Sequence, residues 1–163
     1  MTEDAPAIFQ ALEASNFAAT IRQSVWLYPF ANVGHIVALV CFAGAIAVMD
    51  LRLIGALAAT APAKVIGRAR RVVIVALCAL AATGFLLFSA EASHVIMNPV
   101  FLTKMSLVAA GIVNVTIYEF GAKRAVMALP PGAAMPQVAR VAGFVSLGIW
   151  IVVAGLGRTI AYF

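Results

Sequence analysis

Four long apolar runs limit this chain to one class of protein. They cover about residues 29–55, 72–90, 100–118 and 138–156. As a helix rising about 1.5 Å per residue, each can cross roughly 30 Å of hydrocarbon. Only 10% of the 163 residues are charged, whereas soluble domains carry roughly 25%. Because the connections between runs are short, we predict an all-α integral membrane protein whose four-helix bundle occupies residues 29–163.

A shorter amphipathic segment precedes the bundle, in residues 1–28. Between residues 5 and 24 the apolar side chains recur at roughly helical spacing, which predicts one helix lying on the membrane surface. Trp26 and Tyr28 follow as aromatic residues of the interface, and Pro29 is expected to break the chain before the first crossing. The apolar positions of this interfacial helix are Ile8, Phe9, Leu12, Phe17 and Ile21.

The distribution of positive charge predicts the orientation in the membrane. The formal net charge of +5 arises from basic residues that flank the first and third connections, and such loops face the cytoplasm. We therefore expect a bacterial inner membrane protein with both termini and the second connection in the periplasm. Basic residues at membrane ends, without interleaved aromatics, do not predict a nucleic-acid partner. They are Arg52, Lys64, Arg68, Arg70 and Arg71 at the first connection, and Lys123, Arg124 and Arg140 at the third.

The two histidines, His35 and His94, are the strongest indication of function, because an imidazole in an apolar run is costly unless something binds it. His35 lies 15 residues outward from Asp50, and Lys104 lies 15 residues outward from Glu119. Each offset is about 22 Å along a helix. His35 and Lys104 are therefore predicted to lie at the same depth.

The depth of His94 depends on how the second helix ends. His94 is 23 residues from Arg71, so a straight helix would place it at the outer interface, roughly 10 Å above His35. A chain that bends back could bring it lower, and Asn98-Pro99 predicts where the turn into the third helix occurs.

Each of these residues also has a purely structural interpretation. His35 could bond a neighbouring carbonyl, His94 could be solvated in a loop, and Lys104 could extend to the outer headgroups. Met97 and Met105 more often pack than bind a metal, although a thioether can ligate haem iron or copper(I). Arg158 is either an interface anchor or a clamp for carboxylates.

Haem b suits this arrangement, since it is flat and apolar and needs axial ligands from facing helices. His35 could supply one axial bond and Lys104, His94 or Met97 the other. Arg158 could meet a propionate. Glycines that could provide clearance for the macrocycle are Gly44, Gly84 and Gly111. The spacing of these residues along their helices is compatible with haem binding but does not by itself require it.

Other polar or reactive residues have structural interpretations. Cys41 and Cys78 lie at similar depth and are expected to be inert packing residues inside the bundle. Asp50 and Arg52 are expected to form a structural network with Arg70 or Arg71. Glu119 and Lys123 have the i,i+4 spacing of a helical ion pair.

Two stretches of the chain resemble a known set of membrane proteins. They are the run from Val33 through His35 to Gly44, closing with Leu51-Arg52-Leu53, and Asn98-Pro-Val-Phe-Leu-Thr-Lys104-Met with Asn114. They resemble the first and third helices of small bacterial four-helix membrane proteins. That set includes HemJ-type protoporphyrinogen oxidases, the membrane domain of CopD-type copper proteins, and uncharacterised families. An uncharacterised family is the most similar, over nearly the whole chain through Gly148-Ile-Trp150 and Gly157-Arg158.

The resemblance implies haem b at His35 and Lys104, which match the histidine and lysine associated with haem in HemJ-type proteins. This chain lacks the additional histidines of such an enzyme, so oxidation of protoporphyrinogen is not carried over. In the uncharacterised family a histidine is expected where this sequence has Met97, and His94 lies one helical turn earlier.

We expect a haem b protein of the periplasmic side that passes electrons, with quinol or a periplasmic redox protein as partner beside the lipid bilayer. The first alternative is copper binding or transport at the periplasmic face, as in CopD-type proteins. A second alternative is a non-catalytic membrane subunit. Hydrolase and nucleotide-binding motifs are absent from the sequence. The sequence does not decide whether the chain is an enzyme or whether it forms a homo-oligomer.

Overall fold

A computed structural model describes residues 5–159 of the chain. Its four long helices carry the apolar runs, and each is long and apolar enough to cross a membrane. They are α3 (Leu27–Ile54), α4 (Pro62–Ala90), α6 (Pro99–Gly121) and α8 (Gln137–Thr159). The predicted all-α membrane bundle is confirmed.

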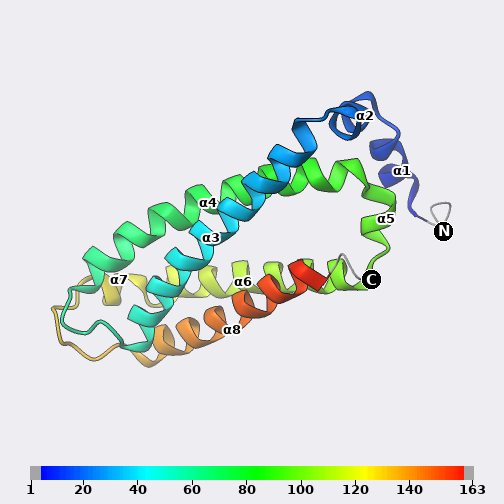
Figure 1. Cartoon of the computed structure of the whole chain (residues 1–163). Helices are drawn as coiled ribbons and strands as arrows, with labels where there is room; N and C mark the ends of the chain where they lie inside the picture. Colours follow the sequence, from blue (N-terminus) through cyan, green and yellow to red (C-terminus); the bar gives the residue numbers. More distant parts are fainter. Residues whose placement is uncertain (1–4, 160–163) are drawn as a thin grey trace.

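Four short helices lie at the two ends of the bundle. Three gather at one end and one at the other (Figure 1). At the end that we call outer are α1 (Ala7–Glu13), α2 (Asn16–Gln23) and α5 (Ala92–Ile96). At the inner end is α7 (Lys123–Met127). The basic connections lie at the inner end.

Local sequence explains where the long helices begin and end. Asn98 caps α6 by accepting hydrogen bonds from the amides of Val100 and Phe101, and Pro99 occupies the first turn, where its missing N–H costs nothing. Gly55 ends α3 in a left-handed conformation, with φ of 115°, while the amide of Ala56 bonds back into the last turn. The predicted turn at Asn98-Pro99 is confirmed.

The predicted interfacial segment has a different form. It folds as two helices, α1 and α2, because Ser15 interrupts the first and caps the second by accepting from the amide of Ala18. The break before the first crossing falls at Ser24, whose hydroxyl accepts from the amides of Trp26 and Leu27. The prediction of a break at Pro29 was wrong. A proline is tolerated in the first turn of a helix, and Pro29 lies inside α3.

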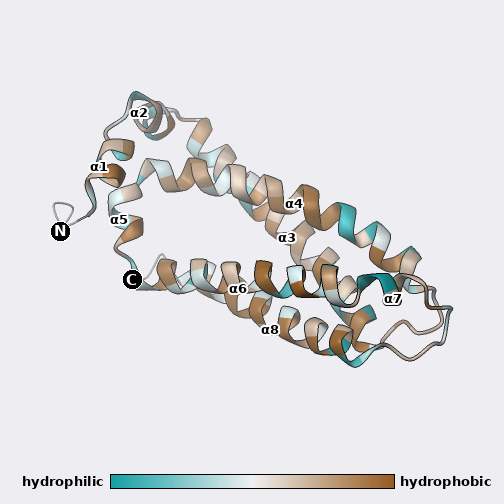
Figure 2. Ribbon diagram, turned by 180° about the vertical axis from the view of Figure 1, so that it is seen from behind, coloured by the Kyte–Doolittle hydropathy of each residue, from teal (hydrophilic) through white to brown (hydrophobic). Residues whose placement is uncertain are grey.

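The long helices form two pairs, α3 with α4 and α6 with α8. The two pairs are joined by packing between α3 and α8. The α3/α4 and α6/α8 pairs approach each other near α7 and diverge toward α5 in both views (Figures 1 and 2). Helices α4 and α6 do not form a close-packed pair along their lengths. The backbones of the two pairs are therefore farther apart toward the outer end (Figures 1 and 2).

Lipid-facing apolar side chains cover the long helices. Figure 2 shows brown, apolar residues along most of α3, α4, α6 and α8, with hydrophilic residues near α7 and the inner part of α4. Cys41 and Cys78 are exposed on this surface as free thiols. The prediction that both cysteines pack inside the bundle was therefore wrong for the single chain.

The densest core lies at the inner end. Tyr118 is 2% exposed and Val126 is fully buried there, between α3, α4, α6 and α7. Close approach of α3 and α8 requires Gly143, because a Cβ at that position would lie 3.0 Å from the backbone oxygen of Asp50. This inner core holds the two helix pairs together, and it leaves the outer half less tightly joined.

Candidate functional site

His35 is oriented by a hydrogen bond between α3 and α4. Its Nδ1 atom lies 2.9 Å from the hydroxyl oxygen of Thr83. The Thr83 hydroxyl lies only 2.6 Å from the backbone oxygen of Ala79, to which it donates its single proton. This geometry favours the tautomer in which Nδ1 carries the imidazole proton and donates it to the Thr83 oxygen.

This assignment leaves the other ring nitrogen of His35 available. In a neutral imidazole with a proton on Nδ1, Nε2 bears a lone pair. Among the residues that the structure describes, Nε2 has no hydrogen-bond partner. A histidine held by one nitrogen with the other one free is the usual arrangement of a metal-ligating histidine.

Small residues allow the His35 ring to lie against α4. A Cβ atom on Gly84 would lie 3.3 Å from Cε1 of His35 and 3.7 Å from Nδ1. One position earlier on each helix, a Cβ on Gly34 would meet the Thr83 methyl group at 3.5 Å. Glycine at both positions brings α3 and α4 close enough for the His35–Thr83 hydrogen bond.

Lys104 of α6 faces this site from the other helix pair. It is partly buried and close enough to interact electrostatically with His35. Its Nζ atom lies 5.3 Å from the centroid of the Phe101 ring, and Phe101 stacks on Phe88 of α4 at 5.5 Å. The cation–π contact stabilises an ammonium group in an apolar setting. The structure therefore places the two residues that were predicted to share a depth within electrostatic range of each other, with no hydrogen bond between them.

The remaining candidate residues are exposed. Helix α4 ends at Ala90, so His94 belongs to the separate short helix α5 and is exposed. Met97 follows α5 and is 49% exposed, and Met105 is 45% exposed. Arg158 is exposed in the last turn of α8. Within residues 5–159, no three His, Cys, Asp or Glu side chains gather to hold a metal ion.

The outer end of α4 is held by α1 and α2. Arg22 donates to the backbone oxygens of Glu13 and Ala90 at 2.9 Å each. The Glu13 carboxylate in turn accepts from the backbone amide of Ser93 at 2.7 Å. These contacts fix where α4 stops and α5 begins, and so they set how far His94 lies from the rest of the site.

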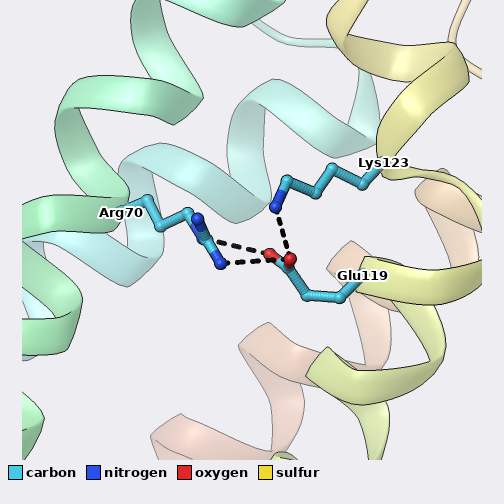
Figure 3. A network of polar contacts seen from close by, with 3 residues as sticks. All are labelled: Arg70, Glu119 and Lys123. Atoms are coloured by element: carbon cyan, nitrogen blue, oxygen red, sulfur yellow. Dashed lines mark hydrogen bonds and ion pairs between the residues drawn. The ribbon is translucent and has the colours of Figure 1, made fainter.

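Three charged residues connect the helix pairs at the inner end (Figure 3). Glu119 of α6 accepts from Arg70 of α4 through both carboxylate oxygens at 3.0 Å and also pairs with Lys123. The predicted Glu119–Lys123 pair is confirmed.

Asp50 and Arg52 form no network with Arg70 or Arg71 among the described residues, so that prediction was wrong. Arg52 instead donates to the backbone oxygen of Thr60, which the loop after α3 brings back over it.

The comparison with protein families gives one match. The family is described as a family of unknown function (DUF6644), and its model covers residues 13–163. The chain belongs to this family. No curated protein and no solved structure matches the chain.

The matched region of the DUF6644 family contains the whole site. It begins at Glu13, which bonds the start of α5, and it includes the His35 and Lys104 pair. Sequence reasoning named Gly84 as one of three glycines that could give clearance, but it missed Thr83, Phe88 and Phe101 as parts of the site. A threonine beside a glycine in the middle of an apolar run was the available signal, since such residues often mark close helix contacts in membranes.

Proposed function

We propose that this protein binds one haem b in the outer half of the bundle, with Nε2 of His35 as an axial ligand, and that it passes electrons. The observation that supports this most is the Thr83 hydroxyl, which accepts from Nδ1 and leaves the lone pair on Nε2. A hydrogen bond to the distal nitrogen of a ligating histidine fixes its tautomer and raises its basicity.

The residues around His35 suit a flat, apolar group. Gly84 leaves one side of the imidazole free of a side chain, and α4 and α6 do not pack closely against each other. One cavity lies in the inner half, and another lies beside Phe17 and Leu86; neither is lined by His35. The macrocycle would lie beside His35 between the two helix pairs, and the protein would supply ligands and orientation.

Lys104 is the favoured second ligand, because it is the candidate whose side chain interacts with His35. A lysine must lose its proton to ligate, which costs free energy at neutral pH. His94 and Met97 avoid this cost, but α5 would have to move inward to bring either to the site. Arg158, in the last turn of α8, is the residue that we propose to pair with a propionate.

The position of the site suggests the redox partners. One haem in the outer half cannot carry electrons across the bilayer by itself. Quinol reaches such a site from the lipid, and a periplasmic redox protein reaches it from the outer face. Basic residues at the inner end support a cytoplasmic inner end and a periplasmic outer end in a bacterial inner membrane.

Absorption spectra of the purified protein, oxidised and then reduced, test the proposal. We expect non-covalent haem b in the parent protein and loss of haem in His35→Ala. The matched control is His94→Ala, which removes the other histidine and should retain haem. Lys104→Ala should alter the spin state if Lys104 ligates, and should shift only the potential if it does not.

Three outcomes would count against this function. A colourless preparation from haem-replete cells that takes up no added haemin would refute haem binding. An unchanged haem spectrum in His35→Ala would refute the site. Stoichiometric copper without haem, measured by elemental analysis of the same sample, would favour the copper-binding alternative instead.

A further inference from the structure

A second polar site lies in the inner half of the bundle, separate from His35. Asp50 of α3 and Tyr118 of α6 are each only 2% exposed. The Oδ2 atom of Asp50 and the hydroxyl of Tyr118 are both buried without a hydrogen-bond partner. Buried polar atoms are almost always satisfied by protein or ordered water, so two such atoms in one place require an explanation.

Both residues line the same cavity, which has a volume of about 60 Å³. A cavity of this kind needs about 10–15 Å³ to admit one water molecule. The walls also include Ser146 of α8, whose side chain bonds to Asp50, and Asn114 of α6, whose amide donates to the backbone oxygen of Ala142. The cavity is therefore large enough for a water molecule, and Asp50 Oδ2 and the Tyr118 hydroxyl offer it two hydrogen-bond partners in an otherwise mostly apolar wall.

The charge of Asp50 has no counter-ion in the cavity wall. The wall contains no lysine, arginine, histidine or glutamate, and Tyr118 is its one other titratable residue. The charged groups on the surrounding helices lie outside this wall. Arg52 donates through Nε and Nη2 to the Thr60 carbonyl, while its Nη1 atom is buried without a partner. Arg70 and Lys123 pair with Glu119, and Arg140 is exposed on α8.

An isolated carboxylate in such a place costs several kcal/mol or more, so it must be solvated, neutralised by a proton, or paired with a bound cation. The Tyr118 hydroxyl helps to distinguish these cases, because its proton also needs an acceptor. A bound cation would satisfy Asp50 but not that proton, whereas a water molecule can accept from Tyr118 and donate to Asp50.

We propose that this cavity is a proton-binding site, in which a water molecule bridges Asp50 Oδ2 and the Tyr118 hydroxyl. On acidification, a hydronium ion in the cavity gives its proton to the Asp50 carboxylate and becomes the bridging water molecule. In the reverse step the carboxylic acid gives its proton to that water and re-forms hydronium, so the carboxyl group alternates between neutral and ionised forms. Ser146 holds the other side of the carboxyl group throughout. This site does not depend on haem binding at His35.

Infrared difference spectroscopy of the full chain in lipid, recorded on either side of neutrality in H2O and D2O, tests the site. We expect acidification to produce the carbonyl stretch of a protonated, buried carboxyl group. Asp50→Asn should abolish this band. The matched control is Glu119→Gln, which removes a carboxylate outside the cavity and should leave the band in place. Tyr118→Phe should keep the band but shift its frequency.

Several results would overturn the proposal. A band that persists in Asp50→Asn belongs to another group, and an unchanged band in Tyr118→Phe means that no water links the two residues. A carboxylate that stays ionised on acidification and responds only when Na⁺ replaces choline indicates a cation site. If Asp50→Asn fails to fold, Ser146→Ala must shift the band, since it removes a hydrogen bond to Asp50 without changing the charge.

Discussion

The Thr83 hydroxyl receives the Nδ1 proton of His35 at 2.9 Å while it gives its own proton to the Ala79 carbonyl at 2.6 Å. The packing of α3 against α4 thereby determines which ring nitrogen of His35 is free. The residues are 48 positions apart in the chain, so the chemistry of His35 depends on how closely α3 and α4 pack.

Replacing Thr83 by valine should weaken haem binding about 10–100-fold, as expected for loss of a hydrogen bond to a ligating histidine. Valine has nearly the shape of threonine but cannot accept the Nδ1 proton. Thr83→Ser is the matched control, because it keeps the hydroxyl and should bind nearly as well as the parent. Titration of each apoprotein with haemin measures the affinities, and equal affinities in Thr83→Val and Thr83→Ser would contradict the role of this hydrogen bond.

Replacing Gly84 by alanine should displace the His35 imidazole. The added Cβ would lie 3.3 Å from Cε1 of His35, which forces the ring or α4 to move. Haem retention should therefore fall, and the spin state of any remaining haem should change. Gly44→Ala is the control, since a Cβ there meets nothing within 4 Å. Equal haem content and spectra in both variants would show that Gly84 does not shape the site.

The Arg70–Glu119 ion pair should stabilise the joined helix pairs by about 1 kcal/mol or less, because both side chains are only partly buried. A double-mutant cycle with Arg70→Met and Glu119→Gln measures this coupling by unfolding in detergent. Lys123 also pairs with Glu119, so the cycle repeated in a Lys123→Met background isolates the α4–α6 contact. A coupling of zero in both backgrounds would mean that the apolar core alone joins the pairs there.

Cysteine labelling should place the two ends of the bundle on opposite sides of the membrane. Val25 is 77% exposed between α2 and α3, and Ala59 is exposed in the inner loop after α3. In a background without Cys41 and Cys78, an impermeant reagent added to whole cells with a permeable outer membrane should label Val25→Cys. Ala59→Cys should react only after the inner membrane is opened. The reverse pattern would invert the proposed topology.

Much of the fold could be predicted because its signals are local. Apolar length predicts the four crossings, Asn98 and Pro99 predict the start of α6, and the i,i+4 spacing predicts the Glu119–Lys123 pair. Helix ends were harder where several cues compete. Pro29 was read as a break, yet Ser24 begins the new segment, because its hydroxyl caps two free amides and Pro29 is compatible with a first turn.

The site was predictable only in part. The equal offsets of His35 and Lys104 along their helices indicated a shared depth, since helical rise is constant. Depth does not give the rotation of a helix about its axis. The partner of His35 and the aromatic pair beside Lys104 therefore could not be deduced, nor could it be told which of the three candidate glycines lies against the imidazole.

The sequence by itself determined that this chain spans a membrane four times, where its basic residues lie along the chain, and which few polar residues fall inside apolar helices. Those features follow from composition and from the regular rise of a helix. Only the tertiary structure decided which of the polar residues meet. It set Thr83 against His35 and brought Asp50 and Tyr118 to one cavity. The reason is physical, because contacts between helices depend on the rotation and close approach that small residues such as Gly84 and Gly143 permit.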